Sequence, residues 1–192
     1  MSRHSFAFVP QALDAATIVR LFNATFLETE QTCLRGGGEE PFYQPADRSG
    51  AVHSIIFTRD YAASALHEVA HWCVAGAQRR LLEDYGYWYA PDGRTAEQQA
   101  LFERVEVRPQ ALEWLFSAAA GRDFHVSADN LSAGLGASEA FKEAIYQQVM
   151  AFCQQGVCVR PQRFMAALLA ASGVAASLQE LLLPTRFARS RL

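Results

Sequence analysis

The stretch LHEVAHWC, at residues 66–73, constrains the fold of this chain more than any other part of the sequence. His67 and His71 are four residues apart, and Glu68 directly follows the first histidine. On an α-helix, residues four apart lie on one face, one turn above the other. Both imidazoles can then bind one metal ion, while Glu68 lies about 100° further around the helix, within reach of a metal-bound water. The spacing therefore predicts a helix that carries a metal site.

A helix whose two histidines pack in the core without a metal is the alternative interpretation. The residues around the motif are largely apolar, among them Val69, Ala70 and Trp72. Two imidazoles and a carboxylate in such surroundings need polar partners, because burying an unpaired polar group is costly. The context therefore favours the metal site.

A metal site of this kind needs a third protein ligand. The segment FERVEVRPQALEW offers three candidates: Glu103, Glu106 and Glu113. We expect Glu106 to be the ligand, because it lies between two valines just before Pro109, where an unpaired carboxylate would be costly. Glu103, one turn earlier, is the reserve candidate and also suits a solvated helix face. His125 is expected to be structural.

Two histidines and one carboxylate leave the other coordination positions of an ion open. That arrangement serves zinc hydrolases, in which a bound water is the nucleophile, and it also serves non-haem Fe(II) enzymes. A zinc metallopeptidase would use Glu68 as its general base. A metal-stabilised binding module without catalysis is a third possibility, although structural zinc sites are usually closed by four protein ligands.

The rest of the sequence predicts mostly helices. One helix is expected to begin after Asp14 and another, with the metal motif, after Asp60, because aspartate is a favoured N-cap. Thr95 and Gln98 form a possible capping box for the next helix. Pro109 is expected to break that helix, since proline suits the first turn and not the interior.

The pattern of strands and loops places a small sheet early in the chain. VHSIIFT, at 52–58, is rich in β-branched and aromatic residues and predicts a strand. RGGGEEPFYQPADRSGA, at 35–51, predicts a loop from its glycines and prolines. Further helices are expected at 137–156 and 161–173, each ending at a glycine.

Composition limits the class of protein. With 192 residues, of which 51% are hydrophobic, we expect an α+β fold, a mostly helical single domain over 1–192 with a small sheet. Residues 1–13 and 185–192 are expected to be peripheral tails, the second one frayed.

The net charge of −3 does not suggest a nucleic-acid partner. Neither a signal peptide nor a membrane span is recognisable, so we expect a cytoplasmic protein that is not bound to a membrane. The oligomeric state is left open.

An aromatic run, DYGYWYAPDGR, follows the metal helix and holds Tyr85, Tyr87, Trp88 and Tyr89. Alternating aromatics suit a strand with one face in the core. They also suit a pocket wall, because aromatic faces bind the stem and the ammonium group of a lysine. We expect Tyr87, Trp88 and Tyr89 to bind the substrate.

These blocks together resemble a known family. ASALHEVAHWCVAG, DYGYWYAPDGR, FERVEVRPQALEWLF, EEPFYQPAD and VSADNL are similar to the bacterial elongation factor P hydroxylases, and the resemblance runs from about residue 15 to about residue 170. It implies a metal-dependent protein lysine hydroxylase, of the non-haem iron monooxygenase type, that acts on elongation factor P. The target lysine in that family usually already carries a β-lysyl group.

The resemblance also implies roles for residues of this chain. His67, His71 and a glutamate of FERVEVRPQ, for which we keep Glu106, would hold Fe(II), with O2 as the co-substrate. Zinc or another divalent transition metal can occupy the same ligands in purified protein. Glu68 matches the motif glutamate of the family, and we expect it to relay protons or to hold the site by hydrogen bonds. The reductant and the hydroxylated carbon are left open, and the zinc metallopeptidase remains the alternative.

Overall fold

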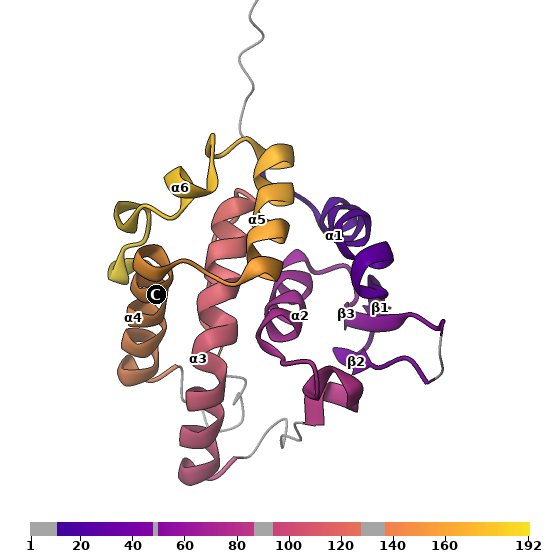
Figure 1. Ribbon diagram of the computed structural model, residues 1–192. Coiled ribbons are helices and arrows are strands. Elements are labelled where there is room, and N and C mark those ends of the chain that lie inside the picture. The colour runs from indigo at the N-terminus through magenta and orange to yellow at the C-terminus, as the bar shows by residue number, and fades with distance from the viewer. Residues whose placement is uncertain (1–10, 48–49, 87–93, 128–136) are drawn as a thin grey trace, which may run out of the picture.

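The computed structural model describes residues 11–47, 50–86, 94–127 and 137–192. The described chain is mostly helical with one three-stranded sheet, which confirms the predicted mixture of elements (Figure 1). The sheet lies at one side of the molecule, α2 lies beside it, and the long helix α3 follows on the far side of α2. Within the described ranges, no helix combines the length and the hydropathy that a membrane crossing requires.

The sheet has the strand order β1-β3-β2. The predicted strand at 52–58 is confirmed as the central strand β3 (His53–Thr58). The prediction of a loop over 35–51 is wrong in part, because β1 (Thr32–Gly38) pairs parallel with β3 and β2 (Phe42–Gln44) pairs antiparallel with it.

The glycines of β1 led to the wrong loop prediction, because Gly36 and Gly38 allow close packing and Gly37 has a positive φ of 95°. A Cβ atom at Gly36 would collide with the carbonyl oxygen of Arg59 and with the ring of Phe57. The strand can therefore approach its neighbour only where the side chain is absent, and the register shifts between Arg35 and Gly38.

Two helices frame the sheet. The first is α1 (Ala15–Glu30), and the prediction of Asp14 as its N-cap is confirmed, since its Oδ1 accepts a hydrogen bond from Thr17 N at 2.8 Å. The second is α2 (Ala62–Val74), which carries the metal motif. The predicted N-cap Asp60 is wrong, because Tyr61 holds that position and makes no side-chain capping bond. Burial of the apolar face of α2 stabilises the helix without a cap.

Helix α3 (Ala96–Ala119) begins at the predicted capping box, in which Thr95 Oγ1 accepts from Gln98 N at 3.2 Å. The predicted break at Pro109 is wrong, because α3 continues through the proline. Proline removes one backbone hydrogen bond and costs about 3 kcal/mol inside a helix. Packing of this helix against α2, α4 and α5 outweighs that loss.

The C-terminal part of the chain covers α3. Helices α4 (Glu139–Gln155) and α5 (Val159–Ser172) confirm the two predicted helices, and the short α6 (Leu178–Leu181) follows. The end of the chain is not frayed as predicted. Phe187 is buried against Trp114 with ring centroids 5.5 Å apart, and Arg189 Nη2 lies 2.6 Å from Glu139 Oε2. The C-terminus accordingly lies beside α4 in Figure 1.

Candidate metal centre

His67 and His71 point from α2 toward α3, where Glu106 meets them. The two Nε2 atoms are 3.0 Å apart. Glu106 Oε1 lies 3.2 Å from His71 Nε2, and Glu106 Oε2 lies 3.6 Å from His67 Nε2. One ligand atom from each of the three residues lies within 4.8 Å of the others. The structure thus brings together the three residues that the sequence predicted as ligands.

The hydrogen bonding of His67 points the lone pair of its Nε2 atom at other acceptor atoms of the cluster, and a cation would compensate this arrangement. His67 Nδ1 lies 2.8 Å from Glu113 Oε2, and the nitrogen must donate because a carboxylate only accepts. A neutral His67 therefore turns the lone pair of Nε2 toward Glu106 and His71. Glu106 is 2% exposed, and its Oε2 has no hydrogen-bond partner. Lone pairs that face one another in a buried place require a proton or a metal ion between them.

The geometry and the donor types fit a divalent transition metal. Two nitrogen ligands at about 2.1 Å from one ion are separated by about 3.0 Å at a right angle and about 3.4 Å at a tetrahedral angle, and the two Nε2 atoms lie at the short end of this range, 3.0 Å apart. Burial by itself raises the pKa of Glu106, but the charge and hydrogen bond of His71 and the charge of His67 outweigh burial and lower the pKa to about 2. Glu106 is therefore ionised and ready to bind a cation at neutral pH.

Glu113 is one of the three glutamates that the segment FERVEVRPQALEW offered as a third ligand, and the structure gives it a different place, beside His67. It is 7% exposed and lies seven residues after Glu106, which is two turns along the same face of α3. The i, i+7 spacing was visible in the sequence, but the predicted break at Pro109 separated the two glutamates. A carboxylate on the outer nitrogen of a metal-binding histidine fixes the tautomer and the ring orientation.

Glu113 also changes the protonation of its partner. Burial lowers the pKa of His67, but the carboxylates of Glu113 and Glu106 outweigh burial and hold the pKa well above its usual value. In the absence of a metal, His67 therefore binds a proton that a metal would have to displace.

Glu68 lies on α2 beside the cluster and outside the group of three ligands. It is half-buried, and burial raises its pKa, with the charges of Glu106 and Asp84 acting in the same direction. A carboxyl group with a raised pKa can hold a proton closer to neutral pH than an ordinary glutamate. This environment suits a proton donor or acceptor.

The other predicted candidates lie away from the cluster. Glu103 Oε2 accepts a hydrogen bond from Ser138 Oγ at 2.7 Å, and Ser138 is the N-cap of α4, so Glu103 connects α3 to α4. His125 is exposed. The predicted substrate-binding residues Tyr87, Trp88 and Tyr89 lie outside the described residues.

The aromatic run begins with a buried residue. Tyr85 is 4% exposed and stacks on Tyr43 with ring centroids 4.2 Å apart. Asp84 and Tyr85 both have positive φ, at 45° and 59°, and Asp84 Oδ1 accepts from Tyr43 N at 2.7 Å. Tyr85 therefore belongs to the core, as expected if the aromatic run packs inward, but it lies in the 3-10 helix η2 (Glu83–Gly86) and not in a strand.

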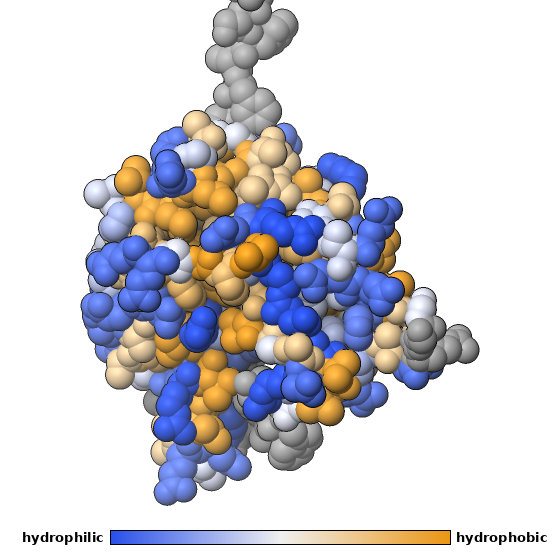
Figure 2. All heavy atoms as spheres, in the orientation of Figure 1, coloured by the Kyte–Doolittle hydropathy of each residue, from blue (hydrophilic) through white to orange (hydrophobic). Residues whose placement is uncertain are grey.

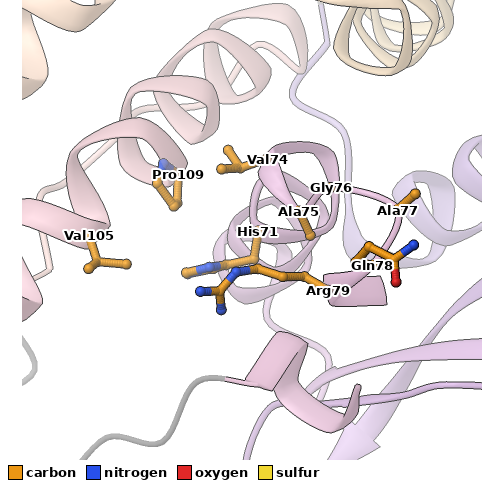
Figure 3. A pocket seen from close by; sticks show the side chains of 9 residues that line it. All are labelled: His71, Val74, Ala75, Gly76, Ala77, Gln78, Arg79, Val105 and Pro109. Atoms are coloured by element: carbon orange, nitrogen blue, oxygen red, sulfur yellow. The ribbon is translucent and has the colours of Figure 1, made fainter. Parts of the chain in front are cut away.

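A cavity of about 420 Å³ adjoins the metal centre (Figure 3). Its lining residues include the following: His71, Val74, Gln78, Arg79, Val105 and Pro109. They come from the end of α2, from the segment that follows it and from α3. Figure 2 shows a hollow on this face, between α3 and the segment after α2, with hydrophobic and hydrophilic side chains at its edges. A ligand in this cavity would reach the His71 side of the cluster.

Comparison with known proteins points to one family. The family model described as elongation factor P hydroxylase matches residues 21–180, which include all three candidate ligands and Glu113. The chain is 48% identical over 153 residues to a Haemophilus influenzae protein named elongation factor P lysine hydroxylase. That alignment covers 80% of this chain and 86% of the relative.

Proposed function

We propose, from the premise that this chain belongs to the elongation factor P hydroxylase family, that it is an enzyme that hydroxylates a lysine side chain of elongation factor P. The observation that carries the proposal is the position of the His67, His71 and Glu106 cluster inside the region that matches the family. The name of the relative supports hydroxylation over peptide hydrolysis, so the metallopeptidase alternative is not favoured.

The proposed metal is Fe(II), held by His67, His71 and Glu106. Two histidines and one carboxylate with open positions are the ligand set of many non-haem Fe(II) oxygenases. The unpartnered Oε2 of Glu106 and the apposed Nε2 atoms support a divalent ion at this place. When bound, Fe(II) would supply the redox chemistry that lets O2 act as the co-substrate. Zinc in the same ligands would give an inactive protein.

The residues of the chain have separate tasks in this proposal. Glu113 holds His67 through Nδ1, so that Nε2 faces the metal position. Glu106 brings a negative charge, which favours a divalent cation. Glu68, with its raised pKa, holds or passes a proton beside the open positions, since reduction of O2 consumes protons.

The proposed substrate is a lysine that already carries a β-lysyl group. Such a side chain is long, contains an amide in its middle and ends in ammonium groups. The cavity beside His71 has a volume in the range of small-ligand sites and opens at the surface, which supports a long side chain that enters from outside.

The test is a mass measurement on the substrate protein. Purified protein loaded with Fe(II) is incubated in air with β-lysylated elongation factor P and a two-electron reductant. Replacement of one C–H by C–OH adds one oxygen, about 16 Da, while the second oxygen atom of O2 leaves as water. Zinc-loaded protein is the control and should add nothing.

The proposal fails if several reductants give no mass gain on elongation factor P. A mass gain that is equal with zinc-loaded protein would also contradict it. Cleavage of a generic peptide by the zinc form, without any hydroxylation by the iron form, would favour the zinc metallopeptidase instead.

A further inference from the structure

A second cavity adjoins the one beside His71. It has a volume of about 420 Å³ and lies between the end of α2, the middle of α3, the end of α4 and the start of α5. Val74, an exposed residue that is labelled in Figure 3, lines both cavities, so they meet at this side chain. A protein segment whose lysine enters the first cavity can therefore reach the second cavity with a neighbouring residue.

Three side chains with N–H donors line the second cavity without hydrogen-bond partners. Arg108 comes from α3, whereas Gln148 and Gln155 lie seven residues apart on one face of α4. Within the described ranges, these side chains make no hydrogen bond and no ion pair, and Arg108 has only the ring of Phe152, 5.9 Å from its guanidinium carbon. A guanidinium is a planar fork of donors that matches a carboxylate, and each glutamine adds an amide donor.

The charge around this cavity is positive, although the whole chain has a net charge of −3. None of the described residues that line either cavity is an aspartate or a glutamate. Arg160 Nη2 donates to the carbonyls of Cys73 at 3.2 Å and Ala75 at 2.8 Å, which line one cavity each, and its Nη1 is buried without a partner. Arg104 is exposed one turn before Arg108 and has no ion pair with another described residue. Both helices thus bring uncompensated positive charge to this opening.

We propose that the second cavity is a docking site for an acidic side chain of the protein substrate, on the segment that flanks the target lysine. The carboxylate accepts hydrogen bonds from Arg108 and from the amide of Gln148 or Gln155, while its methylene groups pack against Leu112. The inference rests on the proposed function, because the partner is the protein whose lysine enters the cavity beside His71. Arg108 then binds the substrate protein and takes no part in the chemistry.

An acidic side chain fits this cavity better than a nucleic acid does. A nucleic-acid backbone is bound by a row of cations along a face, usually on a domain with a positive net charge. Here the arginines gather at one cavity of a chain with a negative net charge, and the cavity has apolar walls from Leu112, Phe152 and Val157. One carboxylate with a short apolar stem satisfies both the donors and the walls.

The experiment measures the binding of whole elongation factor P without turnover. Zinc-loaded protein is titrated by calorimetry with the β-lysylated and the unmodified forms of elongation factor P. Arg108→Gln should bind both forms about tenfold more weakly than the wild type does, the usual effect of losing one hydrogen bond to a charged group. The two factors should be equal, because the docking site contacts the flanking segment and not the modified side chain. Zinc affinity should stay the same, since Arg108 is not a ligand.

Arg20→Gln is the matched control, because Arg20 is an exposed arginine on α1 that lines neither cavity. It should leave both dissociation constants as in the wild type. The titrations are repeated at low and high ionic strength. Affinity should fall with salt more steeply in the wild type than in Arg108→Gln, because the variant lacks one charge pair.

A charge exchange identifies the partner residue. Arg108→Glu should bind elongation factor P more weakly than Arg108→Gln does, since two carboxylates then face each other. The acidic residues of elongation factor P that flank the target lysine are changed to lysine one at a time. The change at the docked residue should weaken binding to the wild type and restore binding to Arg108→Glu.

Wild-type affinity in Arg108→Gln would overturn the proposal, and so would an equal loss in Arg20→Gln, which would show an effect of overall charge alone. A loss confined to the β-lysylated form would place Arg108 in the lysine site instead. An RNA that the wild type binds and Arg108→Gln does not, with unchanged binding of elongation factor P, would assign the cavity to nucleic acid. Binding of elongation factor P without hydroxylation would refute the proposed function and leave the docking site in place, so the two failures can be told apart.

Discussion

Glu103 and Glu106 lie one turn apart on α3 and carry the same functional group, yet their surroundings differ. Glu106 is buried with one oxygen unpartnered, whereas Glu103 is half-buried and binds Ser138. We expect Glu106→Gln to weaken Zn(II) or Fe(II) binding by more than about 100-fold, beyond the usual effect of a residue that only supports a ligand. The measurement is a competition titration with a chromophoric chelator.

Glu103→Gln is the matched control, since it makes the same chemical change one turn away. It should keep the metal affinity of the wild type. If Glu103→Gln loses the metal and Glu106→Gln keeps it, the assignment of the third ligand is wrong.

Glu113 contacts His67, so it would act on a bound metal only through that histidine, and its effect should be smaller than that of a ligand. Glu113→Ala leaves His67 Nδ1 without an acceptor and frees the ring, so metal affinity should fall about 10- to 100-fold. The glutamine in Glu113→Gln can still accept a hydrogen bond from His67 Nδ1, so the metal affinity of this variant should fall less. The same competition titration checks this order. Equal affinities in wild type and both variants would show that Glu113 does not position the histidine.

Glu68 lies beside the ligands without belonging to them. Glu68→Gln keeps the size and polarity of the side chain and removes its titration, so the variant should bind the metal as the wild type does and lose turnover. Loss of a general acid or base typically lowers the rate about 100- to 10,000-fold. The measurement pairs metal content with the rate of oxygen addition to elongation factor P. Full activity would make Glu68 a structural residue.

At the scale of elements, the sequence predicted helices more accurately than strands, for a physical reason. Helices depend on local periodicity and caps, so the α1 N-cap and the capping box of α3 could be recognised from residues a few positions apart. Strand β1 depends on its partner. Its three glycines are locally typical of a loop, and at Gly36 the need for glycine comes from the approach of Arg59 and Phe57, which are distant in the sequence.

The sequence was sufficient to predict the three candidate ligands, which precede Pro109, but not the role of Glu113, which follows it. His67 and His71 share a rigid local element, and Glu106 follows from the cost of burying a carboxylate between valines. The contribution of Glu113 depends on α3 being continuous, and that continuity comes from packing against α2, α4 and α5. Local rules for proline do not contain this information.

The two aspartates that were predicted as N-caps give a matched test of local capping. Asp14 accepts from Thr17 N, whereas Asp60 precedes the true N-cap of α2. Asp14→Ala should lower the melting temperature by about 2–4 °C, the usual effect of one lost cap in a chain of this size. Asp60→Ala should change it by less than about 1 °C. The measurement is thermal unfolding followed by circular dichroism, and equal shifts would contradict the assignment of the caps.

At the scale of the whole molecule, the residues of the candidate metal centre come from two layers of the fold. Helix α2 packs on the sheet and contributes both histidines, while α3 packs against α4 and α5 and contributes both carboxylates. A metal ion between them would cross-link the layer of the sheet to the layer of the C-terminal helices. We therefore expect metal binding and global stability to be coupled, because an ion that binds the folded state alone stabilises it by mass action.

The coupling predicts a pH dependence with a definite sign. In metal-free protein the raised pKa of His67 stabilises the fold at low pH, and this contribution is lost as pH rises through the folded-state pKa. A metal must displace the proton from His67, so its affinity rises over the same range, by up to about tenfold per pH unit. The melting temperature of the metal-free protein should therefore be lower at pH 8 than at pH 6. The increase in melting temperature caused by a fixed zinc concentration should be larger at pH 8.

Thermal scans of chelator-treated protein, with and without zinc at pH 6, 7 and 8, test this coupling. Zinc at about 100 times its dissociation constant should raise the melting temperature by about 5–10 °C at pH 8. Glu106→Gln should show no rise, because it lacks the third ligand. Glu113→Gln should show a flatter pH dependence, since the carboxylate charge beside His67 is gone. A zinc effect that is equal at all three pH values in the wild type would mean that no proton is displaced from His67, and the coupling would then be absent.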